Sequence, residues 1–145
     1  MSDAAEVTDE LALERARSMV SISYEYLGLK ITDGGAGWIE QTLTIRDELL
    51  NGDGILHGGM WAVVADSSMS GAIRTMIDVD RERAVTAQLD IRWLRQARGD
   101  FLRSVGHLVR RGRTLSHCTA ELFDGRGELV GAASGTFMVV TTDSG

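Results

Sequence analysis

The segment from Asn51 to Ser70 holds most of the residues that could do chemistry. Gly58 and Gly59 lie where a loop is expected to become a helix, and Asp66 follows eight residues after Gly58. The first amides of a helix have no partner inside it, and glycine lets a ligand approach the backbone. These donors suit an oxygen that gains negative charge, while the carboxylate could activate water or attack a carbonyl.

Each of these residues also has an ordinary structural interpretation. The Gly58-Gly59 pair could simply allow a helix to pack tightly on a sheet, and His57 could be a structural histidine. Asp66 could be a polar anchor in a subunit interface, and Asn51 a turn residue. Ser70, one turn beyond Asp66 on the same helix face, is by default a small packing residue.

The longest expected helix runs from His57 to about Ile77 and would carry Asp66. Apolar side chains cover nearly its whole circumference; they are Met60, Trp61, Val64, Met69, Ala72, Ile73 and Met76. A helix that is apolar all round is typically buried. A charged side chain inside it therefore needs a partner or a function.

Strands on both sides of this helix are expected to form the rest of one domain, residues 1–145. Thr8 is a candidate N-cap for a short first helix, after a frayed end at residues 1–8. The expected strands are 22–31, 38–46, 85–95, 101–110, 114–123 and 128–140, with turns at 33–37 and 124–127. This order predicts an α+β fold in which a curved antiparallel sheet wraps around one long helix.

Charge and cysteine content argue against several classes of function. The net charge of −6 argues against nucleic-acid binding, and no apolar run approaches the ~20 residues of a membrane span. The acidic first residues do not resemble a secretory signal. The single cysteine, Cys118, is expected to be a small buried strand residue. It cannot form an internal disulfide, which fits a reducing, cytoplasmic location.

Basic charge is concentrated in residues 90–113, which hold seven arginines and two acids. Such a zone on an acidic protein suits an anionic small ligand, although a solvated surface explains it equally well. No metal site is expected, because His57, His107 and His117 lack ligand spacing with acids or with the cysteine.

The pattern formed by Asn51, His57-Gly58-Gly59 and Asp66 resembles the active-site segment of hotdog-fold thioesterases. The nearest subgroup is the phenylacetate-degradation (PaaI-like) type of the 4-hydroxybenzoyl-CoA thioesterase superfamily. The resemblance covers about residues 35 to 140. Its later parts are residues 84–86, 91–95, 111–114 and 127–137. Relatives commonly have Arg-Pro where this chain has Arg95-Gln96.

The resemblance implies an acyl-CoA thioesterase that releases a free acid and coenzyme A, with no cofactor beyond the substrate's own coenzyme A. It implies that the Gly58 amide, beside Gly59, polarises the thioester carbonyl. It also implies that Asn51 helps to hold that carbonyl or the reacting water. His57 would shape this loop.

The resemblance further implies that Asp66 is the general base or the nucleophile. Thr86 matches a position where relatives place a hydroxyl that orients water, and Ser70 matches the water-positioning hydroxyl of another relative. Arginine forks match phosphate oxygens, so the basic zone could contact coenzyme A. The residues assigned to this contact are Arg110, Arg111 and Arg113.

Family members join two sheets edge to edge into homodimers, and often form homotetramers. The resemblance then implies a composite site, with Asp66 facing Asn51 and Gly58 of the other subunit. Three alternatives remain open: a non-catalytic acyl-CoA sensor, a hotdog enoyl-CoA hydratase or dehydratase, and a scaffold without a ligand.

Overall fold

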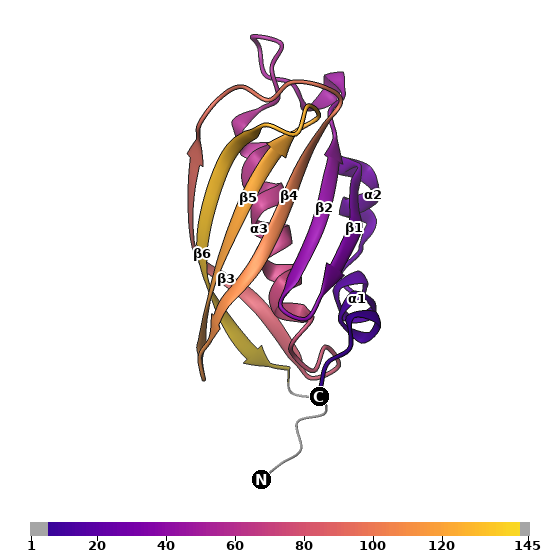
Figure 1. Ribbon diagram of the computed structural model, residues 1–145, viewed down its shortest axis with the longest axis vertical. Coiled ribbons are helices and arrows are strands. Elements are labelled where there is room, and N and C mark those ends of the chain that lie inside the picture. Colours follow the sequence, from indigo (N-terminus) through magenta and orange to yellow (C-terminus); the bar gives the residue numbers. More distant parts are fainter. Residues whose placement is uncertain (1–5, 143–145) are drawn as a thin grey trace.

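The computed structural model describes residues 6–142 of the 145-residue chain, and these form one antiparallel sheet around a long helix (Figure 1). The helical elements are α1 (Asp9–Arg17), α2 (Ile22–Leu27), the 3-10 turn η1 (Asp47–Leu49) and α3 (Gly58–Arg74). The strands are β1 (Leu29–Gly35), β2 (Trp38–Thr44), β3 (Glu82–Trp93), β4 (Phe101–Arg111), β5 (Leu115–Asp124) and β6 (Leu129–Thr141). They lie in the order β1-β2-β4-β5-β6-β3, so β1 and β3 are the edges. The predicted α+β hotdog architecture is confirmed.

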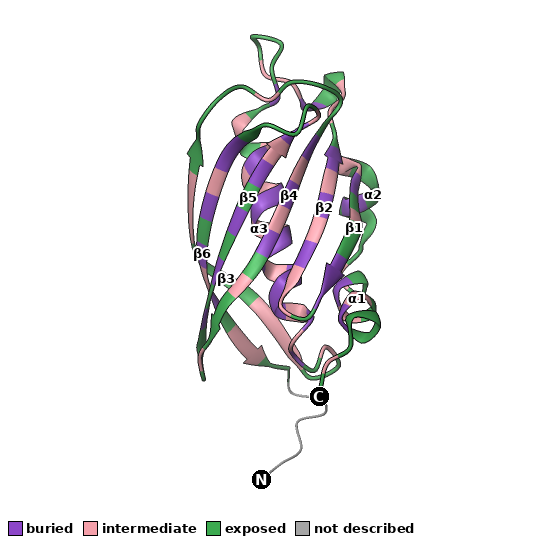
Figure 2. Ribbon diagram, in the orientation of Figure 1, coloured by how far each residue is buried: buried purple, intermediate pink, exposed green. Residues whose placement is uncertain are grey.

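Helix α3 is the centre of the core, as its apolar circumference predicted. Its buried side chains pack against the inner face of the sheet, and β5 shows the alternation of buried and exposed residues that this packing requires (Figure 2). Gly106 of β4 makes this contact close, since a Cβ there would lie 2.3 Å from the backbone carbonyl carbon of Ser68. The helix therefore touches the sheet at the level of the backbone.

The segment 22–31 was predicted as a strand, and this prediction is wrong for its first half. Ile22–Leu27 forms the helix α2, which ends at Gly28 in the left-handed conformation with φ 79°. Glycine adopts this conformation at little cost, and it turns the chain into β1 at Leu29. Tyr24 of α2 is buried, whereas Ile22 is 84% exposed. Although these residue types favour a strand, the segment forms a helix, which buries the aromatic side chain of Tyr24.

The other element predictions need smaller corrections. Thr8 is the N-cap of α1, and its hydroxyl accepts a hydrogen bond from the Leu11 amide at 3.2 Å. The predicted frayed end therefore does not reach Thr8, and residues 1–5 lie outside the described residues. Strand β1 continues to Gly35, which shortens the turn predicted at 33–37. The 124–127 hairpin is confirmed between β5 and β6.

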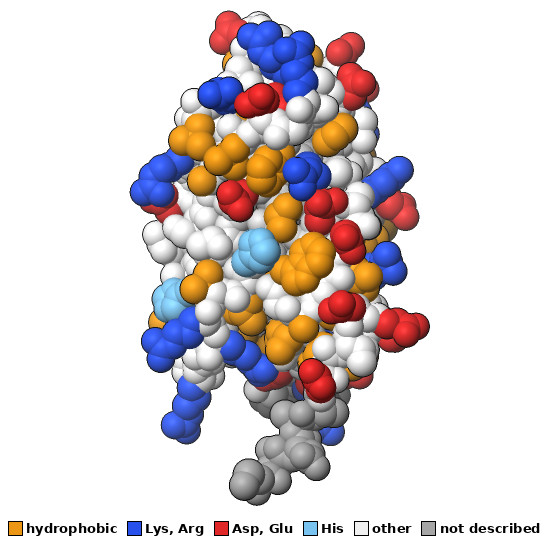
Figure 3. Space-filling view, viewed as in Figure 1, with side chains coloured by type: hydrophobic (Ala, Val, Ile, Leu, Met, Phe, Trp, Pro, Cys, Tyr) orange, Lys and Arg blue, Asp and Glu red, His pale blue; other side chains and the backbone are white. Residues whose placement is uncertain are grey.

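The outer face of the sheet carries hydrophobic, basic and acidic side chains in mixture (Figure 3). His107 and His117 are exposed on strands β4 and β5, and Cys118 is buried, as predicted. Within residues 6–142, no helix has both the length and the apolar character required to cross a bilayer.

Candidate active site

The start of α3 presents one amide that the protein itself does not use. His57 is the N-cap, and its Nδ1 accepts a hydrogen bond from the Gly59 amide at 2.9 Å. The Met60 amide donates to the His57 carbonyl at 2.9 Å. The Gly58 amide, between them, has no acceptor among the described residues. An open donor at the positive end of a helix is suited to a carbonyl oxygen.

Asn51 lies beside this helix start in the preceding loop. Its Oδ1 accepts hydrogen bonds from the Asp53 amide at 2.9 Å and from the Ile55 amide at 3.3 Å. The side-chain oxygen therefore fixes the loop, as in an ordinary Asx turn. The Nδ2 group has no acceptor among residues 6–142 and is left as a donor.

A pocket of about 450 Å³ connects these two donors. Asn51 and Gly58 lie in its wall together with two tryptophans, Trp61 of α3 and Trp93 at the end of β3. The segment after β3, residues 94–97, forms another part of its wall. The pocket is mainly apolar with a few polar groups, which is typical of small-molecule sites.

Asp66 lies elsewhere in the same protomer. The Thr86 hydroxyl of β3 donates a hydrogen bond of 2.6 Å to Asp66 Oδ1. Asp66 is half-buried and Thr86 is exposed, so the pair is reachable from the surface. Eight residues of α3 separate Asp66 from Gly58, about 12 Å of helix. One protomer thus brings Asp66 to Thr86, but it does not bring Asp66 to the pocket that holds Asn51 and Gly58.

The strand beside Asp66 is an open edge of the sheet. Among residues 6–142, β3 pairs only with β6, and residues 85–88 are all exposed. An unpaired strand edge is a surface on which another strand can pair. Ser70, one turn past Asp66, is half-buried, and its hydroxyl makes no hydrogen bond within residues 6–142.

Buried polar side chains fix the rotation of α3 and were missed in the sequence. Gln41 of β2 donates from Nε2 to the Val64 carbonyl at 2.8 Å, and the Ser68 and Ser104 hydroxyls lie 2.7 Å apart. Burial raises the pKa of Tyr24, and the nearby Asp66 charge adds to the increase, while a hydrogen bond with Ser67 opposes it. Gln41 points inward, as do the apolar residues two positions before and after it on β2. A polar residue in this inward series is the signal that could have revealed the network.

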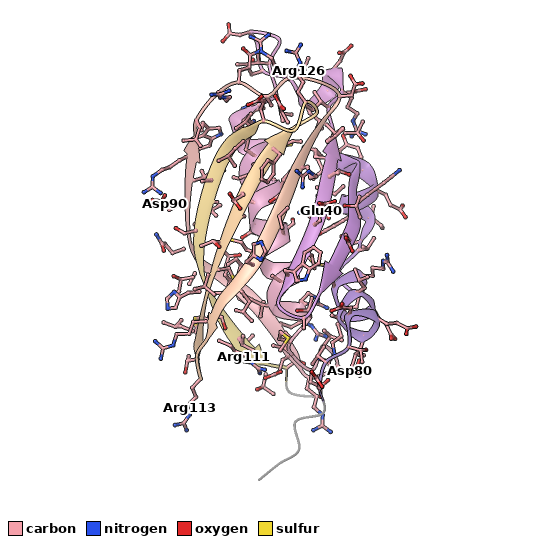
Figure 4. The ribbon with its side chains drawn as sticks, in the orientation of Figure 1. Glu40, Asp80, Asp90, Arg111, Arg113 and Arg126 are labelled. Atoms are coloured by element: carbon pink, nitrogen blue, oxygen red, sulfur yellow. The ribbon has the colours of Figure 1, made fainter. Side chains whose placement is uncertain are left out.

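The arginines assigned to coenzyme A do not reach the pocket of their own protomer. Arg111 donates to the Met76 carbonyl at 2.7 Å and lies 3.6 Å from the Glu82 carboxylate, at the start of β3. The pocket is at the other end of this strand, about 35 Å away. Figure 4 shows Arg111 and Arg113 at one end of the sheet and Arg126 at the other. Arg110 lies on β4 beside Arg111. Arg95 is the arginine that lines the pocket.

Comparisons with known proteins identify the family of the chain. The family model described as Thioesterase superfamily matches residues 53–131, just over half of the chain. A protein from Saccharolobus solfataricus, named provisionally as an esterase, is 27% identical over 96% of this chain and 87% of its own length.

Solved structures share the fold. A thioesterase family protein from Silicibacter pomeroyi superposes with a TM-score of 0.82 at 23% identity, over 90% of this chain and 99% of its own. The E. coli PaaI protein from the phenylacetic acid degradation operon superposes with a TM-score of 0.81 at 22% identity, over 92% and 96% of the two chains.

Proposed function

Because the chain belongs to the thioesterase superfamily, we propose that it is an acyl-CoA thioesterase that hydrolyses a thioester to a free acid and coenzyme A. The observation that carries this proposal is the Asp66 carboxylate. It is the acidic side chain of a largely apolar helix, is held by Thr86, and remains reachable at an open strand edge. A buried scaffold helix would have little reason to keep such a charge.

The proposed site is completed by a second copy of the chain. Pairing of two β3 edges about a two-fold axis would set the two α3 helices antiparallel. The pocket of one protomer would then face its partner's α3, which carries Asp66. This arrangement supplies what one protomer lacks, a carboxylate facing Asn51 and Gly58. Assembly of two such dimers into a tetramer, and a cytoplasmic location, remain expectations.

In this site the Gly58 amide and the Asn51 Nδ2 group would hold the thioester carbonyl oxygen. Asp66 acting as base takes a proton from water, and the water oxygen attacks the carbonyl carbon. The amide donors stabilise the negative oxygen that forms. Collapse breaks the C–S bond, and the proton passes to the leaving sulfur. If Asp66 attacks directly instead, water then hydrolyses the anhydride, and the net reaction is the same.

The phosphates of coenzyme A would be met by arginines from both protomers. Arg95 borders the pocket itself. In the two-fold dimer, the partner's end that carries Arg110, Arg111 and Arg113 would lie near this pocket end. Guanidinium groups bind phosphate oxygens through paired hydrogen bonds.

Thiol release from a panel of acyl-CoAs, followed with a thiol-reactive dye, tests the proposal. The wild type should release thiol, and Asp66→Asn, of nearly equal shape, should lose about 10²- to 10⁴-fold in rate. Asp80→Asn is the matched control, because Asp80 is an exposed carboxylate outside the site. Binding of acyl-CoA without thiol release would instead indicate a sensor. Hydration of an enoyl-CoA would indicate a hydratase.

A further inference from the structure

Asp124, the last residue of β5, uses its two carboxylate oxygens for different segments. Oδ1 accepts hydrogen bonds from the Arg126 amide at 3.0 Å and the Glu128 amide at 3.1 Å, inside the β5–β6 hairpin. Oδ2 accepts from the Arg98 amide at 3.0 Å, in the loop between β3 and β4. One oxygen thus closes the hairpin, and the other binds a loop 26 residues away.

The carboxylate is well suited to this double role. Asp124 is only 2% exposed. Burial alone would raise its pKa, but the amides of Glu128, Arg98 and Arg126 and the Arg126 charge outweigh burial and hold the pKa below its usual value. The side chain therefore remains an acceptor for all three amides, and hydrogen bonds to a charged acceptor are strong ones.

A second contact joins the same two segments without side chains. The Gly125 amide donates to the Arg98 carbonyl at 2.9 Å. Gly99 has φ 90°, and a Cβ on it would lie 2.9 Å from the Gly125 Cα. The loop thus rests directly on the hairpin backbone, and only glycine fits at its closest point.

The tethered loop is continuous with one wall of the pocket. Residues 94–97 line the pocket together with Asn51 and Gly58, and Arg98 follows them directly. We propose that Asp124 is a positioning residue for the substrate pocket: by binding the Arg98 amide, it holds the 94–97 wall at a fixed distance from the α3 start. This inference rests on the proposed thioesterase function, because that function gives the pocket its substrate.

Asp124→Asn separates the two roles of the side chain. An asparagine can keep Oδ1 on the hairpin amides, but its Nδ2 group then faces the Arg98 amide and cannot accept a hydrogen bond. We expect the KM for acyl-CoA to rise about tenfold with kcat within about twofold of wild type, because the wall moves while the reacting groups stay in place. Amide hydrogen exchange of residues 94–100 should become faster, and that of α3 should not change.

Asp100→Asn is the matched control, since it makes the same change on an exposed side chain in the same loop. Gly125→Ala is a second test without a charge change, because its Cβ would lie 3.1 Å from the Gly99 Cα and push the loop outward. It should raise KM in the same way.

Either of two results would overturn the positioning role: wild-type exchange in Asp124→Asn, or faster exchange with unchanged KM. The proposed function and the tether can fail separately. If the wild type hydrolyses no acyl-CoA, but Asp124→Asn still makes amide exchange in the loop faster, the proposed function is wrong and the tether is established.

Discussion

The Thr86 hydroxyl and the Asp66 carboxylate are joined by a hydrogen bond of 2.6 Å between the edge strand β3 and the middle of α3. The bond occupies Oδ1 and orients the carboxylate, and Oδ2 is left for a water molecule or a carbonyl carbon. In the proposed dimer, where this carboxylate would face the neighbouring protomer, such an anchor would fix its rotamer before the substrate binds.

Thr86→Val tests this anchor with a side chain of the same shape. The loss of one hydrogen bond to a charged group should lower kcat by about 10- to 100-fold. The free energy of unfolding should change by less than about 1 kcal/mol, because the residue is exposed. Steady-state kinetics and urea unfolding measure the two effects. Thr119→Val, at an exposed site on β5, is the control, and equal kinetics in both variants would contradict the role of Thr86.

The composite site predicts that two inactive variants can restore each other. Asp66→Asn lacks the carboxylate, and Asn51→Ala lacks the donor in the facing pocket. When the two variants are unfolded together and refolded, half of the randomly formed dimers would contain one chain of each variant. In such a dimer one of the two sites would be intact. About a quarter of the wild-type activity should return. The control is each variant refolded alone. If the mixture stays as inactive as the separate variants, the site is contained in one protomer.

The helix with its carboxylate could be predicted because its signals are local. The apolar run, the glycine pair and Asp66 all lie within a few turns of α3, and the period of two identified the long strands. The partner of Asp66 lies 20 residues away on β3. The resemblance singled out Thr86 only as a hydroxyl that orients water, and no spacing rule would have found its hydrogen bond to Asp66.

Other features depend on tertiary packing that the sequence pattern does not carry. Helix α2 has the residue types of a strand and is decided by the burial of Tyr24 and by the left-handed Gly28. The arginines of residues 110–113 are close in sequence to Arg95, yet the sheet places them at its opposite end. From its neighbours in the sequence, Asp124 is predicted only as a turn residue. Its hydrogen bond from the Arg98 amide depends on how two loops meet in the folded protein.

Gly106→Ala tests the close contact between α3 and β4. A Cβ at this position would lie 2.3 Å from the Ser68 backbone carbonyl, where no side-chain rotation can relieve the overlap. We expect the free energy of unfolding to fall by about 3 kcal/mol or more, measured by urea denaturation. Gly52→Ala is the control, because no atom lies within 4 Å of its Cβ position. A variant as stable as wild type would mean that the helix can move away from the sheet freely.

In the thiol assay that tests hydrolysis, Cys118 of the folded protein should not react measurably with the dye. Burial raises the pKa of its thiol to about 12, and its sulfur lies 3.7 Å from the Met69 carbonyl beneath α3. At pH 8 only about one thiol in 10⁴ would be ionised, and the thiolate is the reactive form. The folded protein without substrate should therefore react with the dye far more slowly than the same chain in urea. The rate of dye reaction, measured across a urea titration, should follow the unfolding curve. Rapid reaction of the native protein would show instead that the β5 face beneath α3 opens without global unfolding.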